Sequence, residues 1–160
     1  MEKIGKILLA EDSEQDVELT LTALDEYHLA NKVDVVCDGA EALDYLYRRG
    51  GFSGLKGDLP VVVLLDLKMP KIDGLEVLRL MKEDPDLKQI PVVMLTSSRE
   101  EQDLLKSYEL GANAYVVKPV DFQQFIQSVK QLGCFWVLIN ESSPKVRNKT
   151  TGSSRDGNAL

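Results

Sequence analysis

The sequence has few of the features that mark disulfide-rich, nucleic-acid-binding or membrane proteins. Its only cysteines, Cys37 and Cys134, cannot form a disulfide framework, so we expect two buried thiols in a reducing compartment. Its 26 acidic residues outnumber its 19 basic ones, and a net charge of -7 argues against nucleic acid as a partner. No apolar run approaches the roughly 20 residues of a membrane span, and the N-terminus lacks a signal-peptide pattern. We therefore expect a cytoplasmic protein that contacts neither nucleic acid nor a membrane.

The length and composition predict one domain followed by a tail. With 160 residues, 44% of them hydrophobic, the chain can bury one ordinary core. Past Pro144 it consists almost entirely of Lys, Arg, Ser, Thr, Gly and Asn. We predict a domain over residues 1–141 and a disordered tail over 142–160. Because so little sequence follows the domain, we expect the output to be contact with another protein.

Short apolar runs alternate with amphipathic patterns along the whole domain. Strands are expected at residues 6–10, 32–37, 61–66, 91–96 and 114–117. Helices are expected at 13–28, 39–49, 75–83, 98–110 and 121–132, and a glycine-rich loop at 50–60. Strands alternating with helices form parallel sheets. The prediction is a flavodoxin-like, doubly wound α/β fold with five parallel strands in the order 2-1-3-4-5 and five helices.

Polar side chains occur where four of the predicted strands end. Glu11 and Asp12 follow the first strand, Asp66 ends the third, Thr96 ends the fourth, and Lys118 follows the fifth. The carboxyl ends of parallel strands meet at one edge of a sheet, so these groups should converge there. Converging carboxylates repel unless a cation such as Mg²⁺ binds them, and a lysine and a hydroxyl can hold phosphoryl oxygens. This pattern predicts phosphoryl transfer onto Asp66 with Mg²⁺ as cofactor.

Each of these residues also has an ordinary structural explanation. Glu11 and Asp12 could be charges at a helix start, Asp66 a turn residue, Thr96 a helix cap and Lys118 a solvated surface charge. Their joint placement at one sheet edge favours the site.

Four motifs resemble those of response-regulator receiver domains of two-component signalling. They are ILLAED, VVVLLDLKMPKIDG, VVMLTSS and AYVVKP, in the order and spacing of that family, and the resemblance covers roughly residues 5 to 140. It implies a phosphoacceptor signalling domain rather than an enzyme, with Asp66 phosphorylated by a partner sensor histidine kinase. It also implies that Asp12 and Asp66 ligate Mg²⁺ directly, Glu11 through water and Lys68 through its backbone carbonyl.

The same resemblance assigns roles to further residues. It implies that Thr96 and Lys118 hold the phosphoryl oxygens, and that Thr96 and Tyr115 form a switch that responds to phosphorylation. A cis Lys118–Pro119 peptide is expected, with Pro70 and Gly74 shaping the loop after Asp66.

Two stretches resemble one subgroup of the family. The glycine-rich insert before the Asp66 strand and the ending LGCFWVLINE are similar to small single-domain regulators paired with bacterial phytochromes, especially in cyanobacteria. A phytochrome kinase is therefore the expected partner.

The end of the last predicted helix carries more apolar residues than one buried face needs. They are Phe135, Val137, Leu138 and Ile139. They could fold back over the sheet, or they could form a self-association surface. A homodimer through the last helix and the last strands is the working hypothesis.

Three other functions were weighed. A phosphatase of the haloacid-dehalogenase type places a second Asp two residues after its nucleophile, where this chain has Lys68. A dinucleotide-binding module needs glycines after the first strand, and AEDSEQD has none. A receiver-like module that binds partners without phosphorylation remains as the alternative.

Overall fold

The computed structural model describes residues 5–107, 114–135 and 138, and it confirms the predicted flavodoxin-like fold. Five parallel strands pair in the order β2-β1-β3-β4-β5. The strands are β1 (Ile7–Ala10), β2 (Val33–Val36), β3 (Val62–Asp66), β4 (Val92–Thr96) and β5 (Ala114–Val117). The helices are α1 (Glu14–Leu24), α2 (Gly39–Tyr47), α3 (Gly74–Glu83), α4 (Arg99–Ser107) and α5 (Phe122–Leu132).

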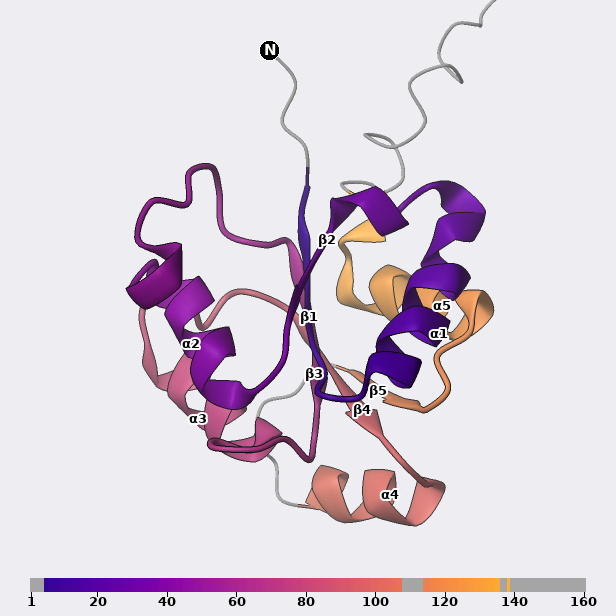
Figure 1. Cartoon of the computed structure of the whole chain (residues 1–160). Coiled ribbons are helices and arrows are strands. Elements are labelled where there is room, and N and C mark those ends of the chain that lie inside the picture. The colour runs from indigo at the N-terminus through magenta and orange to yellow at the C-terminus, as the bar shows by residue number, and fades with distance from the viewer. Residues whose placement is uncertain (1–4, 108–113, 136–137, 139–160) are drawn as a thin grey trace, which may run out of the picture.

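Helices cover both faces of the sheet. In Figure 1, α1 and α5 lie on one side of the strands, α2 and α3 lie on the other, and α4 lies near the ends of β4 and β5. Successive strand residues point to opposite faces, so each central strand contributes to two cores. One core holds Leu8, Val63 and Met94 with the inner faces of α2 and α3, and the other holds Ile7, Leu64 and Leu95 with α5.

The first helix is shorter than predicted. It ends at Leu24, and a 3₁₀ turn over Asp25–Tyr27 leads to His28, which has a left-handed backbone (φ 59°). Leu24 is fully buried whereas His28 is exposed, so extending the helix to His28 would have added no core contact. The chain turns here so that Leu29 can enter the core, with its amide donating to the Leu24 carbonyl at 3.1 Å.

The prediction of two buried thiols is correct for Cys134 and wrong for Cys37. Cys134 lies in the core beside α5, whereas Cys37 is exposed just past the end of β2. Among the described strands β2 is an edge strand paired with β1 alone, and the chain leaves it to start α2, so the thiol is exposed.

The end of the chain folds back in part. Gly133 has a left-handed backbone (φ 80°) that ends α5. Beyond it, Leu138 is fully buried and Phe135 packs partly against the same core, as expected for a segment that folds over the sheet. Trp136, Val137 and Ile139, the predicted end of α4 at Leu110 and the tail over 142–160 lie outside the described residues.

No helix among the described residues is both long and apolar enough to cross a membrane.

Gly74 allows α3 to begin directly beneath the end of β3. Its amide donates to the Leu67 carbonyl at 2.8 Å, and a Cβ at this position would overlap the carbonyl oxygen of Asp66. The loop between Asp66 and α3 can therefore close only around a residue without a side chain.

We predict that Gly74→Ala lowers the free energy of unfolding by roughly 1–3 kcal/mol, the usual cost of overpacking, because backbone must move to admit the methyl group. Gly51→Ala is the matched control, since a Cβ there meets no atom within 4 Å. Urea unfolding of both variants measures the difference. Equal stability of Gly74→Ala and Gly51→Ala would contradict this role for Gly74.

Candidate functional site

Three of the predicted site residues lie on the same side of the sheet because of the strand alternation. Glu11 continues the series Ile7 and Leu9, and Asp66 and Lys118 likewise follow residues that face α1 and α5. All three stand at the carboxyl ends of parallel strands, β1, β3 and β5, where the backbone hydrogen bonds of the sheet continue past the last strand residue. The Glu11 amide donates to the Val36 carbonyl at 3.0 Å, and the Lys118 amide donates to the Thr96 carbonyl at 2.7 Å.

The amine of Lys118 is the centre of the cluster. Its Nζ lies 3.2 Å from Glu11 Oε1, 3.2 Å from Asp66 Oδ1 and 3.0 Å from Asp16 Oδ2. The Lys118 side chain is only 15% exposed, and those of Glu11 and Asp66 are 1% and 7% exposed. Water therefore screens these ion pairs poorly, and they are stronger than ordinary surface pairs.

Asp16 is a member of this cluster that the sequence reasoning missed. It lies in the first turn of α1, where its amide donates to the Ser13 hydroxyl at 3.2 Å. It follows Asp12 by four residues, about one helical turn, and this spacing is the signal that could have placed it beside the site.

The pKa values reflect crowding of negative charge in a buried place. Burial and the neighbouring charge of Asp66 raise the pKa of Glu11 to about 7. Burial also raises the pKa of Asp66, although the charge of Lys118 opposes the rise. Burial alone would lower the pKa of Lys118, but the hydrogen bond with Asp16 and the charges of Asp66 and Glu11 raise it overall. Lys118 is thus a permanent cation, and one lysine does not fully neutralise the carboxylates.

A metal ion would fit the remaining negative charge. Glu11, Asp12 and Asp66 each offer a carboxylate oxygen, and these oxygens lie within 4.8 Å of one another. Asp12 is exposed, so a hydrated cation can reach the cluster from solvent, whereas Glu11 and Asp66 are buried. Hard oxygen donors and a raised Glu11 pKa suit a divalent cation such as Mg²⁺.

A cavity of about 190 Å³ opens at this edge of the sheet. Its lining comes from the loops that follow β1, β3, β4 and β5 and comprises Glu11, Asp12, Ser13, Asp16, Asp66, Lys68, Ser97, Glu101 and Lys118. Sequence reasoning named five of these residues, and it missed Glu101 as it missed Asp16. The pattern Ser98-x-x-Glu101 after a strand, typical of a helix start, was the available signal for Glu101.

Thr96 and Tyr115 lie on the other side of the sheet from Asp66. Thr96 is fully buried, does not line the cavity, and its hydroxyl donates to the Val116 carbonyl at 3.4 Å. Tyr115 is half-buried and packs against the core that contains α2 and α3. The structure therefore brings the two predicted switch residues to the same face but does not bring the Thr96 hydroxyl to Asp66.

The predicted loop-shaping residues lie shortly after the ends of β3 and β5. The Lys118–Pro119 peptide is cis, as the resemblance implied. Pro70 is exposed in the loop between β3 and α3, which ends at Gly74.

The raised pKa of Glu11 predicts that the free energy of unfolding depends on pH. Folded protein binds the Glu11 proton up to about pH 7, whereas the unfolded chain releases it near 4.5. Between these values the folded state holds more protons, so the free energy of unfolding should fall as pH rises, by at most about 3 kcal/mol. Glu11→Gln should flatten this decline in the presence of a chelator, as measured by urea unfolding from pH 4.5 to 8.

Glu14→Gln is the control, because Glu14 is an exposed carboxylate at the start of α1, three residues after Glu11. It should retain the wild-type decline. If the free energy of unfolding of the wild-type protein instead rises with pH between 4.5 and 7, Glu11 is not held protonated by the fold.

Comparison with known proteins agrees with this geometry. A family model described as the response regulator receiver domain matches residues 7–130. The response regulator Rcp1 of Synechocystis sp. is 38% identical over 131 residues, covering 82% of this chain and 88% of Rcp1.

Three solved structures are informative. The bacteriophytochrome response regulator AtBRR is 59% identical with a TM-score of 0.80, over 84% of this chain and 96% of AtBRR. The phosphorylated cyanobacterial phytochrome response regulator RcpA is 41% identical (TM-score 0.67; 84% of this chain, 94% of RcpA). The Mn²⁺-bound form of Rcp1 is 38% identical (TM-score 0.64; 83% of this chain, 94% of Rcp1).

Receiver domains are phosphoacceptor modules that sensor histidine kinases phosphorylate, rather than enzymes that turn over an external substrate. With the family model matched along most of its length and with the acidic cluster typical of receivers at its strand ends, this chain belongs to the response-regulator receiver family.

Proposed function

We propose that this protein is a cytoplasmic response regulator that accepts a phosphoryl group on Asp66 from a sensor histidine kinase and thereby switches a protein-interaction surface. The observation that carries the proposal is the position of Asp66, in a cavity with a half-buried lysine amine 3.2 Å from its carboxylate and two further acidic residues beside it.

In the transfer, a carboxylate oxygen of Asp66 attacks the phosphorus of the kinase phosphohistidine. A P–O bond to Asp66 forms, the P–N bond breaks, and the imidazole nitrogen of the kinase keeps the bonding electron pair and takes up a proton. Lys118 already lies beside Asp66, so its amine can follow the phosphoryl oxygens as their charge develops.

Mg²⁺ is the proposed cofactor, held by Asp12 and Asp66, by Glu11 through water and by the backbone carbonyl of Lys68. When bound, it would neutralise charge shared between the carboxylates and the phosphoryl oxygens. The mutual approach of the acidic oxygens to within 4.8 Å supports this, as does the bound Mn²⁺ in the Rcp1 structure.

Thr96 and Tyr115 are proposed to report the phosphorylation. The Thr96 hydroxyl now donates to Val116 across the sheet, so it would have to turn toward Asp66 to bind a phosphoryl oxygen. That movement would vacate space on the face that Thr96 shares with Tyr115, allowing the aromatic ring to turn inward. Pro70, Gly74 and Pro119 would keep the flanking loops in place.

A phytochrome is the proposed sensor. The support is the similarity to AtBRR, a bacteriophytochrome response regulator, and to RcpA, a cyanobacterial phytochrome response regulator. The identity of 59% to AtBRR extends over 84% of this chain.

A homodimer through the last helix and last strands is also proposed. Leu138 and, in part, Phe135 pack against the core of this chain, so the proposal rests on the further apolar residues in the sequence beyond Leu132. Sedimentation equilibrium at tens of micromolar, with and without beryllofluoride as a phosphoryl mimic, should show a dimer in at least one state. A monomer in both states would contradict it.

The phosphoacceptor assignment predicts that Asp66→Asn abolishes labelling by acetyl phosphate in the presence of Mg²⁺, because an amide cannot form the acyl phosphate. The measurement is incorporation of labelled phosphate into protein. The control is Asp103→Asn, which removes an exposed carboxylate from α4 and should label like wild type. Persistent labelling of Asp66→Asn would refute the assignment and favour a receiver that works without phosphorylation at this residue.

A further inference from the structure

Glu101 sits at the start of α4 with its carboxylate turned into the cavity. Its side chain is 13% exposed, whereas the preceding Glu100 is exposed. Oε1 accepts hydrogen bonds from the Ser97 amide at 2.6 Å and from the Ser97 hydroxyl at 3.1 Å. Burial alone would raise the pKa of Glu101, but these bonds and Lys68 outweigh it and lower the pKa, so the carboxylate is charged at neutral pH.

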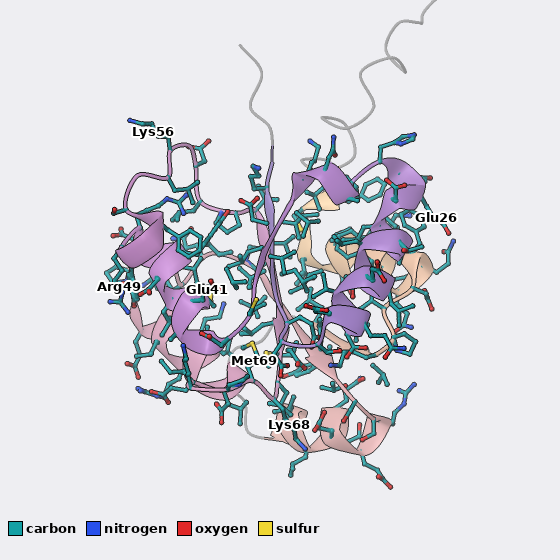
Figure 2. The ribbon with its side chains drawn as sticks, viewed as in Figure 1. Glu26, Glu41, Arg49, Lys56, Lys68 and Met69 are labelled. Carbon is teal, nitrogen blue, oxygen red and sulfur yellow. The ribbon has the colours of Figure 1, made fainter. Side chains whose placement is uncertain are left out.

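The second oxygen of Glu101 reaches the other wall of the cavity. Oε2 lies 3.4 Å from Nζ of Lys68, two residues after Asp66. Figure 2 shows the Lys68 side chain extending from the end of β3 toward α4. The single carboxylate thus ties together the residues that follow β3 and β4, across the mouth of the cavity that holds Asp66.

These two donors are suited to an anion at Asp66. In the sheet, Asp66 of β3 pairs with Leu95 of β4. Ser97 follows Leu95 by two residues, so its amide belongs to the chain segment that leaves β4 beside Asp66. A phosphoryl group brings about two negative charges and three acceptor oxygens. It would repel the Glu101 carboxylate and compete with it for the same amide hydrogen and the same amine.

We propose that Glu101 is a positioning residue that occupies the Ser97 amide and Lys68 in the unphosphorylated protein and so slows phosphoryl transfer to Asp66. This rests on the proposed function of Asp66. Glu101 acts as a resident carboxylate that the incoming phosphoryl group must displace before these donors are free to bind it. Its charge sets how readily the site takes up phosphate from its donor.

The test is Glu101→Gln, which removes the charge and the ion pair with Lys68 but leaves an oxygen able to accept from Ser97. We expect acetyl phosphate to label this variant roughly three- to tenfold faster than wild type, because repulsion of the incoming anion is lost. Beryllofluoride affinity, followed by fluorine NMR with Mg²⁺ present, should rise by a similar factor. This second readout involves no transfer chemistry.

Glu100→Gln is the matched control, since it makes the same charge change in the same turn of α4 without contact with Ser97 or Lys68 among the described contacts. Acetyl phosphate should label it at a rate within twofold of the wild-type rate, because the loss of an exposed surface charge has only a weak effect.

Equal acceleration of labelling in both variants would overturn the inference. Unchanged or slower labelling of Glu101→Gln would also overturn it, since that is the result expected if Glu101 is only a helix cap. An unlabelled wild type would instead refute the Asp66 assignment, and urea unfolding confirms that each variant is folded.

Discussion

The ion pairs of Lys118 hold together carboxylates that would otherwise repel one another in a buried place. Three carboxylates from two segments approach one amine within 3.2 Å, and little water reaches Glu11 and Asp66. The lysine satisfies part of the negative charge, while burial and the neighbouring charge of Asp66 raise the pKa of Glu11. The acidic oxygens are placed where they could hold a cation, and the lysine lies beside the carboxylate proposed to accept the phosphoryl group.

The fold is arranged so that these charges can meet only at one edge. Parallel pairing puts the strand ends side by side, and the alternation of strand residues turns Glu11, Asp66 and Lys118 to the α1/α5 side. Thr96 falls on the opposite side, where it contacts β5 rather than the cavity. At this one edge, the reacting groups thus face one side of the sheet and the residues proposed to transmit the change face the other.

Sequence reasoning was strongest where chemistry follows directly from periodicity. The strand order and the convergence of Glu11, Asp66 and Lys118 depend on the alternation of strands with helices and on the spacing of the motifs, both of which can be read from the sequence. Asp16 and Glu101 escaped because each looked like an ordinary charge in a first helical turn, and only the tertiary structure brings them to Lys118 and Lys68. The burial of Cys37 was misjudged for a similar reason, since its exposure follows from β2 being an edge strand.

The proposed function requires that Asp66, among several crowded carboxylates, is the residue that accepts the phosphoryl group. Borohydride reduction of the phosphorylated protein, followed by peptide mass spectrometry, locates an acyl phosphate directly because the modified carboxyl is reduced to an alcohol. We predict homoserine at position 66 and unmodified Glu11, Asp12 and Asp16. Homoserine-type reduction at one of those three residues, with Asp66 unchanged, would contradict the account.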